Sequence, residues 1–152
     1  LTYGGGRALI KKVWLEDFDG HDAQVITSGK SFFLKYQVEF LEDLDDLVFA
    51  MMIKTREGVS IYGTDSATIE NKKLRFSSGE KIVISFALNN YLAPGDYHLN
   101  CGIRQDTSET TTFIYRAVDI LSFKVARNST TTVASGIVDM ESKIKILDSI
   151  DE

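Results

Sequence analysis

The sequence predicts an all-β domain that folds as a two-sheet antiparallel β-sandwich. Short segments in which apolar and polar residues alternate recur along almost the whole chain, and this period of two is typical of half-buried strands. Polar turns separate these segments at intervals of roughly 8 to 15 residues, as in sandwiches. A parallel sheet would need crossover helices, and apart from the C-terminal tail the chain shows no apolar stripe at helical spacing.

Eight segments are predicted to be strands. The third shows the clearest alternation, because Leu34, Tyr36, Val38 and Phe40 are separated by polar residues. The fourth follows an acidic turn and is apolar throughout, as expected of a strand that is buried on both faces. In order, the predicted strands cover residues 8–18, 24–27, 32–41, 47–53, 59–62, 81–88, 97–103 and 113–125, the last with a break near Asp119.

Residues Gly29, Lys30 and Ser31 raise the question of a nucleotide site, because a phosphate-binding loop ends in these three residue types. Such a loop needs a further glycine at position 24, which is Gln24, and it must lead into a helix. Here a predicted strand follows instead. We therefore predict a turn between two strands and no nucleotide bound by this segment.

Length and composition place the chain among globular proteins with one domain, here residues 1–152. Its 152 residues are 43% hydrophobic and 26% charged, and no apolar run reaches the length of a membrane span. The net charge of −5 argues against nucleic acid as a partner. The single cysteine, Cys101, excludes an internal disulfide and is expected to be a small buried side chain.

The stretch Leu92–Tyr97, with the sequence LAPGDY, predicts a tight turn before a strand. Pro94 sets φ at the first central position, and Gly95 permits a positive φ at the second. The hydroxyl of Tyr97 is expected to fold back onto this turn, as in the tyrosine corner of sandwich domains.

This turn and several other segments of the chain, taken in order, resemble the sequences of a known protein family. The segments are YGGGRALIKKVWLEDFDG (3–20), TSGKSFFLKYQVEF (27–40), VSIYGTDSA (59–67), SSGEKIVISFALNNYLAPGDYHLNCGI (77–103) and ILSFKVARNSTTTVASGIVDM (120–140). In this order they are similar to the C-terminal domain of the ATP-binding subunit of O-antigen polysaccharide ABC transporters, the Wzt type. The resemblance implies an immunoglobulin-like or jelly-roll sandwich fused behind a nucleotide-binding domain, so that the chain is expected to be a fragment of a longer subunit.

The family also implies a function for the domain. It binds the non-reducing end of lipid-linked O-polysaccharide in the cytoplasm, at the inner membrane, and so selects chains for ATP-driven export. In some systems that end carries a methyl, phosphate or acidic cap. The expected partners are this glycan, the membrane-embedded transporter subunit and a second copy of the chain. Family dimers in some cases exchange C-terminal strands, for which residues 133–152 are the candidate. The part 140–147 suits either a last strand or a short helix.

Candidate binding residues follow from what a sugar needs, namely flat rings to stack on and planar polar groups for its hydroxyls. His98, Asn100 and Arg104 alternate with apolar residues and are expected to project together from one face of a strand. We expect a sugar shelf where these residues meet a ring, and a bidentate contact from arginine to an anionic cap. The other interpretation is an ordinary solvated sheet face. The further candidates are Trp14, Tyr91 and Tyr115 as rings, Arg116 for the cap, and Lys35 and Gln37 on a second strand.

Catalysis, metals and cofactors are not predicted for this domain. Its acidic residues lie at turns rather than in facing pairs, and two histidines are too few for a histidine-rich zinc site. Asp17, Asp19 and Asp22 are a conceivable calcium site, although they lack the EF-hand pattern. A protein-interaction or oligomerisation sandwich without glycan binding is the alternative function, and a small sandwich hydrolase is a distant third.

Overall fold

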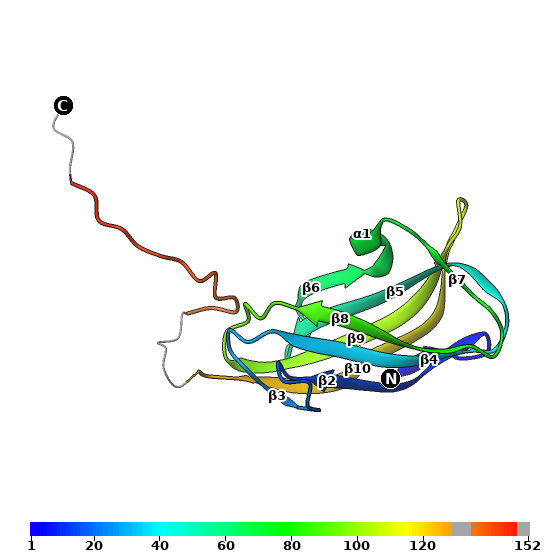
Figure 1. Cartoon of the computed structure of the whole chain (residues 1–152), viewed down its shortest axis with the longest axis horizontal. Helices are drawn as coiled ribbons and strands as arrows, with labels where there is room; N and C mark the ends of the chain where they lie inside the picture. Colours follow the sequence, from blue (N-terminus) through cyan, green and yellow to red (C-terminus); the bar gives the residue numbers. More distant parts are fainter. Residues whose placement is uncertain (129–134, 149–152) are drawn as a thin grey trace.

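The protein consists almost entirely of strands arranged in two sheets, which confirms the predicted fold class (Figure 1). The computed structural model describes residues 1–128 and 135–148. The larger sheet contains β1 (Thr2–Gly4), β3 (Val25–Thr27), β5 (Leu44–Thr55), β6 (Ser60–Asp65), β7 (Leu74–Phe76), β9 (Gly95–Asp106) and β10 (Thr111–Ala126), and the smaller sheet contains β2 (Ala8–Glu16), β4 (Phe32–Phe40) and β8 (Lys81–Leu88).

The strand order places β9 in the middle of the larger sheet. Its main path is β1-β10-β9-β5-β6, with β3 paired to β10 and β7 paired to β5, and the smaller sheet has the order β2-β4-β8. All pairs are antiparallel except β3 with β10. Polar side chains that point outward from β9 therefore lie at the centre of a broad sheet face, between those of β5 and β10.

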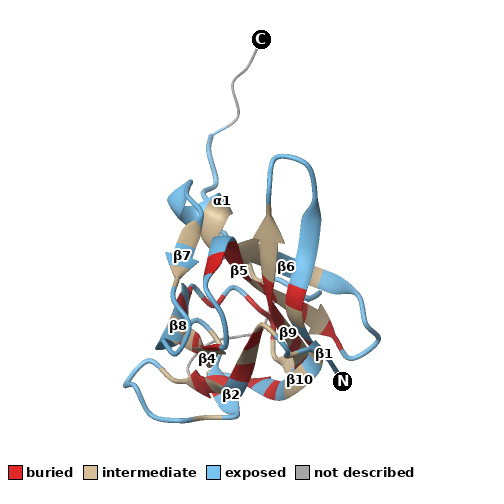
Figure 2. Ribbon diagram, turned by 90° about the vertical axis from the view of Figure 1, so that its right-hand side faces the viewer, coloured by how far each residue is buried: buried red, intermediate tan, exposed pale blue. Residues whose placement is uncertain are grey.

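The core lies between the two sheets and follows the alternation of the sequence. On β4 every second residue from Phe32 to Phe40 is at most 1% exposed. Phe40 stacks on Phe76 with ring centroids 4.7 Å apart, and Phe49 of the larger sheet meets both rings edge-on. Figure 2 shows buried residues along the facing strands. Burying one such side chain stabilises the fold by about 1.5–3 kcal/mol.

Tyr36 connects the two sheets through its hydroxyl group. This side chain is fully buried on β4, and its Oη donates to the carbonyl oxygen of Ala50 on β5 at 3.1 Å. Burial raises the pKa of the Tyr36 phenol well above its ordinary value, so the hydroxyl keeps its proton and donates.

The turn before β9 forms the predicted tyrosine corner. The Tyr97 hydroxyl donates to the carbonyl oxygen of Ala93. The positive φ that we expected at Gly95 is not observed, and that part of the prediction is wrong. The predicted turn at Ser28–Lys30 is also present, with Gly29 at φ 82° and the Lys30 amide donating to the Thr27 carbonyl.

Three elements escape the sequence prediction because each is short. Strand β1 pairs with β10 through the glycine-rich N-terminus, where a Cβ on Gly4 would lie 2.2 Å from the Ile114 carbonyl oxygen. Strand β7 has three residues. Helix α1 (Ser66–Glu70) is capped by Asp65, whose carboxylate accepts from the Thr68 amide.

The C-terminal segment adopts neither of the two structures expected for residues 140–147. Leu92 and Val138 form an isolated bridge, after which residues 140–148 extend away from the sandwich without helix or strand (Figure 1). Met140, Ile144 and Ile146 are 85–90% exposed. Within the described part of the chain no strand lies beside this segment, so its backbone is not paired with either sheet. Residues 133, 134 and 149–152 of the expected exchange segment lie outside the described residues.

Candidate functional site

The outer face of the larger sheet carries three of the predicted binding residues. His98, Asn100 and Arg104 are half-buried on β9 and alternate with Leu99 and Ile103, which lie in the core. The alternation predicted this placement, and the structure shows it. The three side chains do not act alone, however: His98 and Asn100 are hydrogen-bonded to β10, and Arg104 is ion-paired to Asp106 of its own strand and to Asp65 of β6.

A polar cluster surrounds a bulge in β10. This cluster consists of Lys54, His98, Asn100, Asp119 and Ser122. Asp119 lies where the register of β10 on β9 shifts, and its φ is 51°. Its amide donates to Asn100 Oδ1 at 2.8 Å, and its carboxylate oxygen Oδ1 lies 2.6 Å from Lys54 Nζ. His98 Nδ1 and Ser122 Oγ lie 2.9 Å apart. The predicted strand break near Asp119 is this bulge.

Arg104 is held between two carboxylates. Its Nε lies 2.9 Å from Asp106 Oδ2, and its Nη2 lies 3.2 Å from Asp65 Oδ2. Burial opposes ionisation of Asp65, yet hydrogen bonds from Thr68 and the charge of Arg104 bring the pKa of that carboxyl below its ordinary value. The predicted contact of Arg104 with an anionic cap is therefore disfavoured, because two carboxylates already bind its Nε and Nη2 and balance its charge.

An exposed aromatic shelf lies on the same face, beside β9. We give this name to Tyr3, Phe113 and Arg116. Tyr3 is 51% exposed and pairs with Arg116 across β1 and β10, and Phe113 is 54% exposed and pairs with Arg104. The Arg116 guanidinium lies 4.7 Å from the centre of the Phe113 ring. Among the described residues Arg116 has no carboxylate partner.

Trp14, Lys35 and Gln37 lie on the other side of the molecule. Trp14 pairs with Lys35 on the outer face of the smaller sheet, so the structure does not bring it beside His98. Both side chains bind Glu16, through Trp14 Nε1 at 2.8 Å and Lys35 Nζ at 2.8 Å. These two bonds lower the pKa of the Glu16 carboxyl. The predicted shelf of Trp14 with His98 and Asn100 is thus not formed.

Tyr91 and Tyr115 are also separated from the polar cluster. Tyr115 pairs with Ile103 and packs against the core, because a register shift at Ile114 changes the phase of β10. Tyr91 is exposed beside an apolar cavity of about 390 Å³ at an open edge of the sandwich. That cavity is lined by Phe32, Ile53, Ile61, Tyr62, Ala87, Leu88, Asn89, Tyr91, Leu92 and Val138.

A second hollow, of about 400 Å³, extends from the polar cluster toward one end of the larger sheet. Its lining includes His98 and Ser122 together with Gln24, Arg56 and Lys124. Val25, Tyr97 and Phe123 also line it, so the hollow combines hydrogen-bonding groups with apolar surface.

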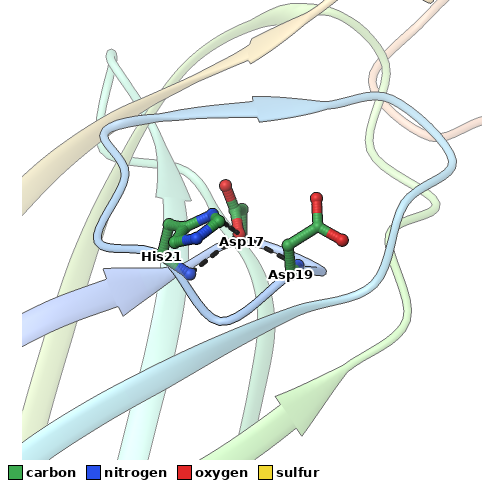
Figure 3. Close-up of side chains that lie close together, drawn as sticks. All are labelled: Asp17, Asp19 and His21. Atoms are coloured by element: carbon green, nitrogen blue, oxygen red, sulfur yellow. Dashed lines mark hydrogen bonds and ion pairs between the residues drawn. The ribbon is translucent and has the colours of Figure 1, made fainter.

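The acidic turn after β2 brings Asp17, Asp19 and His21 close together, with one ligand atom of each within 4.8 Å of the others (Figure 3). Asp17 Oδ1 accepts from the amides of Asp19 and His21, both at 3.0 Å. Asp22, which we had grouped with the two aspartates, is not part of this cluster. The Asp17 carboxylate thus has a structural role in the turn.

Sequence reasoning missed Tyr3, Phe113, Lys54 and Asp119 on the outer face. Tyr3 lies in a glycine-rich segment without alternation. The bulge after Phe113 interrupts the alternation that would show on which face of the sheet its ring lies. Lys54 is visible in the sequence only as the polar end of an apolar run. Of these four residues, only Asp119 could be recognised from the sequence as unusual, because an acidic residue interrupts a long apolar strand there.

These features define a class of protein: a two-sheet β-sandwich domain whose larger sheet carries polar and aromatic side chains on its outer face. No helix among the described residues is long and apolar enough to cross a membrane. The chain matches the family model of the Wzt C-terminal domain over residues 1–140, and it belongs to that family. A search of curated protein sequences found no match.

One solved structure agrees with this assignment. A crystal structure of the C-terminal domain of Wzt has a TM-score of 0.84 at 26% identity, over 97% of this chain and 88% of that one. The CARDB domain of the PF1109 protein from Pyrococcus furiosus follows, with a TM-score of 0.44 at 13% identity over 83% and 93% of the two chains. A β-glucosidase from Listeria innocua gives 0.45 at 11% over 82% and 16%.

Membership of this family supports a general role in O-antigen ABC transport. The Wzt C-terminal domain is a non-catalytic, carbohydrate-binding part of an ABC ATPase subunit. The sequence-based predictions of the family and of this general role are thereby confirmed.

Proposed function

We propose that this domain binds the non-reducing terminus of lipid-linked O-antigen polysaccharide and selects it for ATP-driven export across the inner membrane. The observation that carries the proposal is the aromatic shelf. Two half-exposed rings lie together on the outer face of a carbohydrate-binding domain with an arginine that has no carboxylate partner in the described part of the chain. Exposed rings that add nothing to the core suit a surface that receives a ligand.

The chemistry of the shelf suits the end of a glycan chain. Tyr3 and Phe113 offer flat apolar surface to the C–H faces of a sugar ring, at a low cost in side-chain entropy. Arg116 offers a guanidinium to an oxygen-rich group, and its planar fork suits a phosphate or carboxylate cap. Arg104, which we first assigned to the cap, instead supports the sheet through Asp65 and Asp106.

In the whole transporter the domain recruits substrate, and other parts carry out the remaining steps. ATP hydrolysis belongs to the nucleotide-binding domain of the parent subunit, which works at the cytoplasmic side of the inner membrane with a membrane-embedded partner. This domain needs no cofactor, since stacking and hydrogen bonding alone hold the sugar.

Calorimetric titration tests the proposal. The domain is titrated with delipidated O-polysaccharide from the bacterium that encodes it, and with the same material from an unrelated strain. We expect a measurable Kd for the first and none for the second. Enzymatic or chemical removal of the terminal residue from the matching glycan should abolish binding. Equal binding to both glycans would contradict terminus recognition, and binding to neither would favour the alternative, a protein-interaction sandwich.

We also propose a homodimer that forms by exchange of the C-terminal segment. Three apolar side chains, Ile144, Ile146 and Leu147, are 72–90% exposed on a segment that leaves its own sandwich (Figure 1). Strand β8 is an edge strand, with an apolar hollow between its side chains and those of β6 and α1. An edge strand with unpaired backbone groups readily accepts an added strand. A second copy's 141–147 segment has the length and apolar content to fill that place.

Light scattering on the intact chain and on a chain that ends at Asp139 tests the exchange. The intact chain should have the mass of a dimer and the shortened chain that of a monomer. A substitution control, Ile144→Ser with Ile146→Ser, should weaken the dimer without shortening the chain. A dimer that persists in the shortened chain would contradict the exchange.

A further inference from the structure

We infer that Asp119 is the residue that holds a neutral sugar of the glycan, and that Asn100 and Lys54 position its carboxylate. This inference rests on the carbohydrate-binding role proposed above and assigns that role a central contact. It concerns the polar cluster and not the aromatic shelf.

The backbone at Asp119 is the first support. Its φ of 51° lies in the left-handed region, which residues other than glycine rarely adopt, although aspartate tolerates it better than most. The residue lies inside the β10 bulge, and the Asn100 side chain holds its amide at 2.8 Å. Bulges often redirect a side chain next to a functional site, and strained backbone persists where its surroundings fix it.

The ion pair with Lys54 is the second support. The Lys54 side chain is 13% exposed and that of Asp119 is 52% exposed, so the cation lies beneath the sheet surface and the carboxylate above it. The bond from Lys54 lowers the pKa of the Asp119 carboxyl, which is therefore ionised at neutral pH. Lys54 contacts Oδ1, and among the described residues no donor reaches Oδ2. An acceptor of fixed direction thus faces solvent.

The balance of charge selects the kind of ligand. Lys54 and Asp119 neutralise each other, so their pair attracts neither an anion nor a cation from a distance. What the pair does offer is an exposed carboxylate oxygen for a hydroxyl donor. A hydroxyl group of a neutral sugar matches this acceptor.

The surroundings suit a sugar ring as well. Met52 lies opposite Asn100 on β5, and a Cβ on Gly63 would lie 2.5 Å from the Met52 methyl carbon, so this side chain lies flat over the glycine. The Met52 side chain thus leans toward β6, on the side of β5 away from Asp119. Along β9, Asn100 is two residues from Gly102, which pairs with Arg116 of the shelf, a separation of about 7 Å. A glycan end on the shelf would place its next sugar near Asp119.

Four variants and one ligand test the inference. Asp119→Asn keeps the shape and removes the charge, and Asp119→Gly keeps the backbone conformation and removes the side chain. Lys54→Met leaves the carboxylate without its partner. The matched control is Asp46→Asn, because Asp46 is an exposed aspartate at φ 55° at a register irregularity of β5, on the stretch that faces β7. Each is titrated calorimetrically with the delipidated O-polysaccharide of the bacterium that encodes the chain, and urea unfolding of each variant is recorded.

Both Asp119 variants should fold and should bind about 10- to 100-fold more weakly, as expected for a lost hydrogen bond to a charged group. Lys54→Met should lose less, and Asp46→Asn should bind as the unchanged chain does. On the unchanged chain, NMR titration should shift the Asp119 amide resonance. The inference is overturned if Asp119→Asn or Asp119→Gly binds within twofold of the unchanged chain, if Lys54→Met loses as much as they do, or if that resonance stays in place. Absence of binding by the unchanged chain would overturn the proposed function itself.

Discussion

Removal of the Phe113 ring should weaken glycan binding by about tenfold and leave stability unchanged. Phe113 is 54% exposed, and a Phe side chain offers roughly 200 Å², so about 100 Å² of ring faces solvent. A sugar that stacks on one side of the ring covers about half of this surface. At about 25 cal/mol per Å², the 50 Å² removed from water stabilise the complex by about 1.3 kcal/mol, which corresponds to about tenfold in Kd.

The chain offers a matched control in Phe18. This ring is 61% exposed, and the Lys30 ammonium group lies 5.6 Å from its centre, as the Arg116 guanidinium lies 4.7 Å from the centre of Phe113. Phe18 belongs to the turn after β2 and not to the outer face of the larger sheet. Phe113→Ala and Phe18→Ala therefore remove similar rings with similar cations, and each should change the free energy of unfolding by less than about 0.5 kcal/mol.

Calorimetric titration with the matching O-polysaccharide distinguishes the two variants. Phe113→Ala should raise Kd about tenfold, and Phe18→Ala should leave it unchanged. The reasoning is refuted if Phe113→Ala binds within twofold of the unchanged chain, or if Phe18→Ala loses as much. Urea unfolding of both variants ensures that a loss of affinity is not a loss of fold.

Three further predictions concern stability and reactivity. Tyr36→Phe removes the hydroxyl that joins the sheets and should lower the free energy of unfolding by about 1 kcal/mol, seen as a fall of about 2–4 °C in Tm, with no change in glycan affinity. Asp65 has a lowered pKa, so its contribution to stability is complete above the ordinary aspartate pKa of about 3.9 and disappears as pH falls through the lower folded value. The difference in urea midpoint between Asp65→Asn and the unchanged chain should accordingly be constant from pH 7 to about pH 5 and shrink below about pH 4. Burial raises the pKa of the Cys101 thiol to about 12, so a thiol reagent at pH 8 should modify the unfolded chain and spare the folded one.

The alternation of apolar and polar residues was sufficient to predict the longer strands and, where no bulge intervenes, the face on which their side chains lie. It placed His98, Asn100 and Arg104 on one face because a strand has a strict period of two. It also located the irregularity at Asp119, where the period fails. It left out β1, because three glycines remove the pattern there.

Alternation does not show which sheet a strand joins. Trp14 and His98 both project outward from their strands, yet they lie on opposite sides of the molecule, because β2 belongs to the smaller sheet and β9 to the larger. Strand pairing depends on contacts between residues far apart in sequence, and no local pattern contains that information. Tyr115 illustrates a second limit, since a single bulged residue before it turns its side chain toward the core.

Two residues on the same face of a sheet can have different roles. Those whose polar groups already bind other side chains stabilise the sheet, and those whose polar groups are unpaired are available to a ligand. Arg104 on β9 and Arg116 on the neighbouring strand β10 lie on the same face of the sheet and differ in their partners. Arg104 binds Asp106 through Nε and Asp65, which is 39 residues away in sequence, through Nη2, so part of its donor capacity is used before any ligand arrives. Arg116 contacts the Phe113 ring and keeps its guanidinium open to solvent. A glycan gains most from groups whose hydrogen-bonding capacity the fold leaves unused, because no internal bond must break first. By this criterion we expect the binding surface to centre on Arg116, beside the exposed Phe113 ring, and on the open oxygen of Asp119.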